Sequence, residues 1–268
     1  MARTTVGMIG LGKMGGPMAG HLLRRKFPVL GYDISPERCR ELRRRGGTVC
    51  PDVASVGRGA RVVIVMVGYD HEVVGVCSGP GGLIAQMARG ATLVISSTMK
   101  LDTIRRLERA AARKGIVLID APVCRAEEGA IAGTLLMLGS GDRRAFDRIR
   151  PVMRAFCTDI YHVGKVGAGQ VAKICNNLLL WISMVANCET FTLAERCGLD
   201  KAALAQALSI SSGTNGTILR WEKMTAPWWH KDLAIALEFA EQLGMGLPMA
   251  GLTKQLFKTY KLPKVKVK

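Results

Sequence analysis

The chain has 268 residues, a hydrophobic content of 49% and only 5% aromatic residues, which predicts one large or two ordinary domains with a mainly aliphatic core. A net charge of +17 would suit anionic partners, but the basic residues are scattered and do not alternate with aromatic side chains. This pattern argues against a specific nucleic-acid-binding surface and favours a solvated surface charge that attracts small anionic metabolites. The alternative is non-specific binding of polyanions.

The eight cysteines are spread along the chain without a CxxC pair or a Cys/His ligand spacing. In a chain of this length they predict reduced, mostly buried thiols, no metal centre and a cytoplasmic protein. No signal-peptide pattern precedes the first apolar run, and the apolar segment 178–186 is too short to span a bilayer. We expect this segment to be buried within a helix, and we expect no association with membranes.

The first 120 residues alternate short apolar runs with helix-compatible stretches. These runs predict five strands, at 6–9, 29–32, 62–67, 92–96 and 116–119. Between them we predict helices at 36–45, 72–88 and 101–114 and a short helical stretch before Arg61. The alternation predicts right-handed βαβ crossovers and therefore a doubly wound parallel sheet of the Rossmann type. In such an α/β domain, ligands bind at the carboxyl ends of the strands.

A glycine-rich turn follows the first predicted strand and reads Gly10-Leu11-Gly12-Lys13-Met14-Gly15. Gly10 permits a tight turn, Gly12 lets the backbone approach a pyrophosphate, and Gly15 lets the next helix pack close to the strand. The N-terminus of that helix offers N–H groups to phosphates. Strand, turn and helix together predict a dinucleotide-binding site that includes Leu11 and Met14.

Asp33 ends the second predicted strand, at roughly the spacing of about 20 residues expected after the glycine turn. Its carboxylate would accept hydrogen bonds from the ribose hydroxyls and repel a 2′-phosphate. We therefore predict NAD as the cofactor and regard NADP as less favoured. Arg38 is close in sequence, but it is expected to lie about a turn into the next helix.

The pattern changes near residue 165, where glycines precede a continuous helical pattern from about 170 to 197. The remainder is helical, around 201–210, 231–243 and 251–260. We predict a Rossmann domain over 1–163 and an all-helical domain over 164–268, joined by a long interdomain helix.

Gln170 and Lys173 begin this helix, and Lys173 shares a face with Asn177. A partly desolvated lysine between domains is a candidate general acid/base, and the alternative is a solvated lysine at a helix start.

Five motifs occur in the order and approximate spacing of the β-hydroxyacid dehydrogenase family: GLGKMGGPMAGHLL, Ser97-Thr98, DAPVCRAEEGAIAGTLLMLGSGD, GKVGAGQVAKICNN and HKDLAIAL. From residue 5 to about 250 the chain resembles this family, which includes 3-hydroxyisobutyrate dehydrogenases and tartronate semialdehyde reductases. It is also similar to 6-phosphogluconate dehydrogenases. The resemblance implies an NAD-dependent oxidoreductase that transfers a hydride between nicotinamide and a small hydroxy acid.

The resemblance also implies roles for individual residues. Lys173 would be the catalytic acid/base, and Asn177 would orient the substrate. Thr98 would lie beside the nicotinamide end of the cofactor, with Val67 at a nearby position where relatives usually have leucine. Lys231 would reach the cofactor from the helical domain, unless it only forms a surface pair at a helix start. Because relatives form dimers or tetramers, we expect a homodimer or homotetramer.

One turn departs from the family pattern, because Cys124-Arg125-Ala126 replaces the usual Ser-Gly-Gly that binds the substrate carboxylate. The planar fork of an arginine suits carboxylate or sulfonate, and sulfolactaldehyde reductases resemble this chain in having an arginine at this step. We predict a small anionic β-hydroxy acid, semialdehyde or sulfonate, gripped by Arg125 and lined by Cys124 and Ala126. The alternative is that Arg125 points to solvent.

The helical part departs further from the family. The stretch 211–230 is about a dozen residues shorter than in relatives, and the final KLPKVKVK replaces a helical segment. These departures favour a second interpretation, a catalytically weak or inactive binding or scaffold protein that retains the dehydrogenase fold. A third class, the imine reductases, is disfavoured because those relatives commonly replace the lysine found here at 173.

Overall fold

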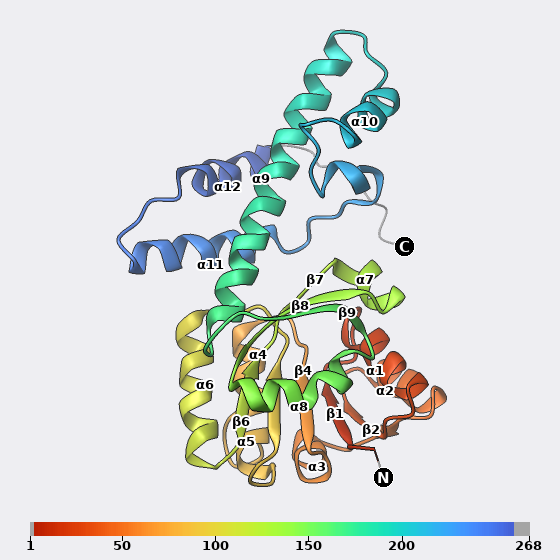
Figure 1. Cartoon of the computed structure of the whole chain (residues 1–268), viewed down its shortest axis with the longest axis vertical. Coiled ribbons are helices and arrows are strands. Elements are labelled where there is room, and N and C mark those ends of the chain that lie inside the picture. Colours follow the sequence, from red (N-terminus) through yellow and green to blue (C-terminus); the bar gives the residue numbers. More distant parts are fainter. Residues whose placement is uncertain (1–2, 260–268) are drawn as a thin grey trace. The chain divides into compact units, whose positions relative to one another are not determined.

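The computed structural model describes residues 3–259 and shows two compact units, Met1–Lys173 and Ile174–Lys268 (Figure 1). The sequence places the domain boundary between residues 163 and 164. The compact units instead divide between Lys173 and Ile174, within the long helix that begins at Ala168.

The first unit is built on a sheet whose strand order is β3-β2-β1-β4-β5-β6-β8-β7, with β9 paired to β8. The strands are β1 (Val6–Ile9), β2 (Val29–Tyr32), β3 (Thr48–Val49), β4 (Val62–Val65), β5 (Thr92–Ile95), β6 (Val117–Asp120), β7 (Val123–Cys124), β8 (Leu135–Gly141) and β9 (Cys157–His162). All pairings from β3 to β6 are parallel, which confirms the Rossmann-type sheet. Strand β8 runs antiparallel to β6 and β7 and parallel to β9, so the complete sheet is mixed.

Helices connect these strands. They are α1 (Gly15–Arg24), α2 (Pro36–Arg44), α3 (Val53–Gly59), α4 (Asp70–Cys77), α5 (Leu83–Gln86), α6 (Leu101–Arg113), α7 (Ala126–Ala132) and α8 (Arg143–Met153). The prediction of one helix over 72–88 is wrong, because the chain forms α4 and α5 there. Gly79 at a φ of +79° and Pro80 interrupt the helical backbone between them.

Strands β1, β4, β5 and β6 are almost entirely buried because helices cover both faces of the sheet, whereas β2 is buried at alternate residues and β3 is not buried. Met8 of β1 packs into an apolar cluster with residues of α1, α2 and α8, whereas its neighbour Ile9 packs into a second cluster with residues of α3 to α6. Successive side chains of a strand point to opposite faces, so one short strand serves both clusters. Cys77 belongs to the second cluster, and burial raises the pKa of its thiol to about 12.

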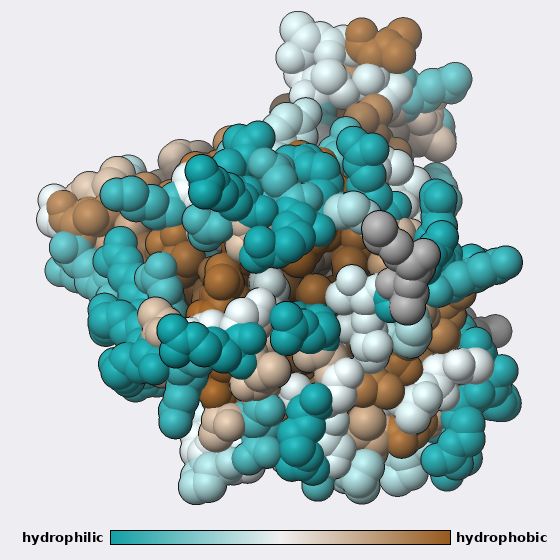
Figure 2. All heavy atoms as spheres, turned by 60° about the horizontal axis from the view of Figure 1, so that its bottom comes forward, coloured by the Kyte–Doolittle hydropathy of each residue, from teal (hydrophilic) through white to brown (hydrophobic). Residues whose placement is uncertain are grey.

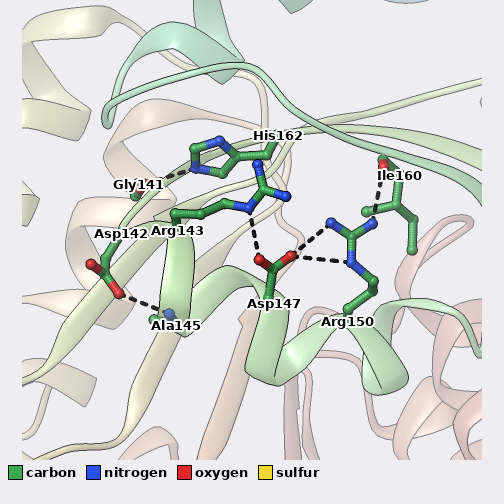
Figure 3. A network of polar contacts seen from close by, with 8 residues as sticks. All are labelled: Gly141, Asp142, Arg143, Ala145, Asp147, Arg150, Ile160 and His162. Atoms are coloured by element: carbon green, nitrogen blue, oxygen red, sulfur yellow. Dashed lines mark hydrogen bonds and ion pairs between the residues drawn. The ribbon is translucent and has the colours of Figure 1, made fainter.

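A polar network on α8 joins this helix to the edge of the sheet (Figure 3). Asp142 caps the helix by accepting a hydrogen bond from the backbone N–H of Ala145 at 2.8 Å. Asp147 accepts from Arg143 Nε at 2.7 Å and from Arg150 Nη2 at 2.8 Å, and these bonds hold its pKa below the ordinary value. Arg150 Nη1 also donates to a backbone carbonyl of β9. The sequence predicts neither α8 nor the three strands around it.

The regular elements in the described part of the second unit are all helices, which confirms the all-helical expectation. It contains most of α9 (Ala168–Arg196), then α10 (Lys201–Ser209), the 3₁₀ helix η1 (Ile218–Lys223), α11 (Trp229–Gln242) and α12 (Pro248–Thr259). Its core includes Trp181, Met184, Leu233 and Phe257. The last residue of the helix predicted over 251–260 and the final lysine-valine tail lie outside the described residues.

Helix α9 exposes part of its apolar surface. The prediction that segment 178–186 is buried holds for Trp181 and Met184 but is wrong for Leu179, which is 70% exposed. By length and composition alone, α9 is apolar enough to cross a membrane, and 33% of its apolar window is buried within the chain. Figure 2 shows apolar atoms reaching the surface between hydrophilic side chains on one face of the molecule.

Candidate active site

The turn between β1 and α1 has no room for side chains at two of its glycines. Gly10 has a φ of +88°, and a Cβ atom there would overlap the carbonyl oxygen of Met66. A Cβ atom at Gly15 would overlap the carbonyl oxygen of Gly10. Met14 occupies the N-cap position of α1, so the turn leads directly into the N-terminus of that helix. This bare backbone fits the pyrophosphate of a dinucleotide.

Asp33 is fixed beside the turn by two backbone donors. Its Oδ2 accepts from the N–H of Leu11 at 2.6 Å, and its Oδ1 accepts from the N–H of Ser35 at 2.8 Å. The side chain is only 5% exposed. Contrary to the sequence expectation, Arg38 reaches this site, because its Nη1 lies 3.5 Å from Asp33 Oδ2.

The ends of β4 and β5 are tied together through Ser97. Its hydroxyl accepts from the N–H of Val67 and donates to the Val67 carbonyl, both at 2.9 Å. The half-buried Thr98 follows Ser97 in the chain. The structure therefore places the predicted cofactor positions Val67 and Thr98 at the carboxyl ends of neighbouring parallel strands.

A buried network centred on Asp120 joins the end of β6 to the first turn of α9. Asp120 Oδ2 accepts from Ser140 Oγ and from the backbone N–H groups of Gly167 and Gln170, at 3.0 to 3.1 Å. Its Oδ1 accepts from Gln170 Nε2 at 2.7 Å. Burial raises the pKa of Asp120, although these hydrogen bonds act in the opposite direction.

Gln170 also binds the segment after β5, since its side chain accepts from Met99 N–H and donates to the Ser97 carbonyl. The amide is completely buried. Gln170 therefore ties the segment after β5 to the end of β6. The only sequence signal for this network was the position of Asp120 at a strand end, because its partners lie 20 to 50 residues away.

Lys173 lies one turn further along α9 and contacts Cys124, the last residue of β7. Its Nζ is 3.7 Å from Cys124 Sγ. The lysine is half-buried, whereas the cysteine is only 5% exposed. The structure thus brings together the predicted catalytic amine and one predicted pocket residue, which come from segments almost 50 residues apart.

Arg125 and Ala126 keep a glycine-like backbone although neither is glycine, with φ angles of +82° and +50°. Arg125 Nη1 donates to the Thr134 carbonyl at 2.8 Å, to Thr158 Oγ1 at 3.0 Å and to Asp159 Oδ2 at 2.6 Å. These contacts anchor one nitrogen of the guanidinium against β9. Hydrogen bonds from Thr158 and Arg125 lower the pKa of Asp159.

In the second unit, Asn177 is held by a buried carboxylate. Asn177 Nδ2 donates to Asp232 Oδ2 at 2.8 Å, and Trp181 Nε1 donates to the same oxygen at 3.1 Å. Lys231 precedes Asp232 on α11, and its ammonium lies 5.3 Å from the centre of the Trp228 ring. The sequence analysis assigns a role to Lys231 in the HKDL motif but none to the next residue, Asp232.

Within residues 3–259, no group of three or more His, Cys, Asp or Glu side chains could hold a metal ion. Asp33 after β2 has the position of a ribose-binding carboxylate, and the Lys173 amine on α9 can transfer a proton. A glycine turn with a ribose-binding carboxylate and a separate amine characterise dinucleotide-dependent oxidoreductases of the Rossmann class.

Comparisons with known proteins agree with this class. Residues 5–164 match the family model described as the NAD binding domain of 6-phosphogluconate dehydrogenase. Residues 167–264 match the model described as NAD-binding of NADP-dependent 3-hydroxyisobutyrate dehydrogenase. The chain belongs to the β-hydroxyacid dehydrogenase family.

Individual relatives are similar over nearly their whole length. A 3-hydroxyisobutyrate dehydrogenase of Pseudomonas aeruginosa is 35% identical over 95% of this chain and 91% of that protein. An NAD-dependent L-serine dehydrogenase of the same organism is 32% identical over 94% of this chain and 91% of that protein. The solved 3-hydroxyisobutyrate dehydrogenase of Mycobacterium tuberculosis with L-serine is 27% identical, covers 96% of this chain and 93% of its own, and has a TM-score of 0.85. The chain is thus an NAD-dependent hydroxyacid dehydrogenase that acts on a CH–OH group.

Proposed function

We propose that the protein interconverts a small anionic β-hydroxy acid or hydroxysulfonate and its carbonyl form, with Lys173 as the general acid/base. The observation that carries this proposal is the position of the Lys173 amine, 3.7 Å from the Sγ of Cys124, the last residue of β7. The 3-hydroxyisobutyrate and L-serine dehydrogenases to which the chain is similar are named for small hydroxy acids.

When bound, NAD supplies the nicotinamide ring that exchanges a hydride with the substrate carbon. In oxidation, neutral Lys173 accepts the proton of the substrate hydroxyl as that carbon loses its hydride. In reduction, the protonated amine returns the proton to the carbonyl oxygen. Asn177 orients the substrate through its side-chain amide, whose own orientation is set by Asp232.

Arg125 supports an anionic substrate because only one of its terminal nitrogens is anchored. Nη1 is bound by Thr134, Thr158 and Asp159, while Nε and Nη2 make no hydrogen bond within the described part of the chain. These two nitrogens form the side-on edge of the guanidinium, which binds carboxylate or sulfonate through two parallel hydrogen bonds.

The first experiment compares the wild type with Lys173→Ala in a screen of hydroxy acids and sulfonates. Because a positioned acid/base contributes about 10²- to 10⁴-fold, we expect kcat to fall by that factor while NADH binding, followed by nucleotide fluorescence, is unchanged. Lys165→Ala removes an exposed lysine just before α9 and should retain full activity. Wild-type turnover by Lys173→Ala would remove Lys173 from the mechanism.

We also propose that the protein is a homodimer or homotetramer that buries apolar residues of the second unit. Leu179 and Leu193 of α9 and Leu219 of η1 are all more than 60% exposed. Large apolar side chains left exposed in this number are typical of an association surface.

A further inference from the structure

We propose that Cys124 and Lys173 form a redox modification site, at which a peroxide oxidises the thiol and the lysine amine then closes a covalent S–N bond. The cross-link occupies the amine that the proposed function uses for proton transfer, so oxidation switches the enzyme off reversibly. Formation of the bond is independent of the proposed function, and only the effect of the bond on activity rests on it.

The Lys173 amine contacts the Cys124 sulfur directly. Nζ lies 3.7 Å from Sγ, and within residues 3–259 the amine makes no other hydrogen bond and no ion pair. Cys124 is the last residue of β7, whereas Lys173 extends from α9 on a flexible four-carbon side chain. Rotation of that side chain brings the nitrogen to bonding distance from the sulfur without movement of the strand.

The sheet places its other cysteine away from Cys124. Cys157 of β9 pairs with Leu135 of β8, while Cys124 pairs with Leu136. Because neighbouring residues of a strand point to opposite faces, the two sulfur atoms lie on opposite sides of the sheet. Burial in an apolar cluster also raises the pKa of the Cys157 thiol to about 12. Cys157 therefore forms no disulfide with Cys124, and the amine is the group placed to react with an oxidised sulfur.

The reaction consists of two balanced steps. The Cys124 thiolate attacks hydrogen peroxide, the O–O bond breaks, and a sulfenic acid and hydroxide form, so the sulfur is oxidised and the peroxide is reduced. The neutral amine of Lys173 then attacks the sulfenic sulfur. An S–N bond forms, the S–O bond breaks, and the hydroxyl group leaves as water with one proton of the amine. A thiol reverses the second step by attacking the sulfur, which releases the amine and gives a mixed disulfide.

Partial burial of the pair suits a small oxidant. Cys124 is 5% exposed and Lys173 is half-buried, so hydrogen peroxide, which is little larger than water, reaches the sulfur more readily than a bulky disulfide does. The amine is held beside the sulfenic acid and reacts as an intramolecular partner. It therefore competes well with a second peroxide molecule, which would carry the sulfur on to the irreversible sulfinic acid.

The test treats the full chain with hydrogen peroxide and follows the peptides that carry Cys124 and Lys173 by mass spectrometry. We expect the two peptides to be joined, with a combined mass lower by two hydrogen atoms, and dithiothreitol to separate them. Lys173→Arg keeps the positive charge but has no amine that condenses with a sulfenic acid, so Cys124 should instead carry added oxygen atoms. Cys175→Ser removes an exposed thiol two residues further along α9 and should form the cross-link as the wild type does.

The wild-type masses alone decide whether the bond forms. A free Lys173 amine in oxidised protein, with Cys124 either unmodified or carrying oxygen atoms, would overturn this inference and leave the proposed function intact. The joined peptide in Lys173→Arg would equally overturn it, because another group would then have reacted.

Activity is measured on the same samples, with the substrate found in the screen of hydroxy acids and sulfonates. We expect the lost fraction of activity to equal the cross-linked fraction and to return with dithiothreitol, because the bonded nitrogen no longer acts as an acid/base. Full activity of cross-linked protein would overturn both the switch and the proposed role of Lys173, although the modification site itself would stand.

Discussion

At the scale of single residues, Asp120 shows how a buried carboxylate can be structural even though it lies at a strand end where ligands bind. Its two oxygens accept four hydrogen bonds, from Ser140, Gly167 and both the backbone and side chain of Gln170. A fully satisfied buried network fixes the geometry of the groups that it joins. Asp120 therefore sets where α9 begins and, three residues after Gln170, where Lys173 is placed.

In an Asp120→Asn variant, an NH₂ group replaces one of the two oxygens that accept hydrogen bonds. This donor would face the N–H and O–H donors of Gly167, Gln170 or Ser140 and could not bond to them. We expect the free energy of unfolding at pH 7, measured with urea, to fall by about 1–3 kcal/mol. Asp142→Asn is a matched control, because asparagine caps a helix about as well as aspartate does. Equal stability of Asp120→Asn and wild type would show that the network contributes nothing.

The difference in free energy of unfolding between wild type and Asp120→Asn should depend on pH, because the pKa of Asp120 is raised. Between the ordinary value of 3.8 and the higher folded value, the native state binds more protons at this group than the unfolded state does. The part of the Asp120 contribution that comes from its raised pKa is therefore present below 3.8 and is lost as the pH rises through the folded pKa, whereas the hydrogen bonds to the carboxylate remain. We expect the stability difference between wild type and Asp120→Asn to narrow as the pH rises, and a widening difference would contradict the sign of the shift.

At the scale of elements, the turn between β7 and α7 retains a backbone suited to glycine while carrying an arginine and an alanine. Positive φ angles at Arg125 and Ala126 cost roughly 1–2 kcal/mol each for residues that have a Cβ atom. The contacts of Arg125 with Thr158 and Asp159 on β9 help to hold this turn. The arginine thus has structural partners on one nitrogen, and its other edge is where we propose that the substrate binds.

An Arg125→Ala variant tests whether the Nε and Nη2 edge of Arg125 binds the anionic group of the substrate. Because charge-assisted hydrogen bonds contribute about 1.5–3 kcal/mol, we expect KM for the anionic substrate to rise about 10- to 100-fold, with a smaller change in kcat. Arg154→Ala removes another exposed arginine of the same unit and should leave KM unchanged. An unchanged KM of Arg125→Ala for every anionic substrate would eliminate the proposed role.

At the scale of the whole molecule, local patterns predict the parallel strands, the glycine turn and the long helix, because each has its own period or motif. They do not predict β8, whose sequence LLMLGSG contains two glycines and has no clear alternation. The approach of Arg38 to Asp33 and the bonds between Asp120 and Gln170 were also missed. These depend on how separate elements pack, which no spacing along the chain reveals.

The apolar surface of the second unit leads to a prediction about assembly. Sedimentation analysis should give a dimer or tetramer of the 28.9 kDa chain. Leu193→Glu, at a side chain that is 67% exposed, should weaken association about 100-fold, because burying a leucine contributes about 1.5–3 kcal/mol. Ile34→Glu alters an exposed apolar residue of the first unit and serves as the control. A monomeric wild type at micromolar concentration would contradict the prediction.

The network around Asp120 also limits how this protein can exchange parts with its relatives. The first family model ends at residue 164, yet Gly167 and Gln170, which satisfy the buried carboxylate, lie beyond that boundary. A chimera joined at residue 164 would leave Asp120 dependent on foreign donors, and an unpaired buried carboxylate is strongly destabilising. A chimera that takes the nucleotide-binding part from this protein should therefore also include Gly167 and the first turn of α9, which contains Gln170.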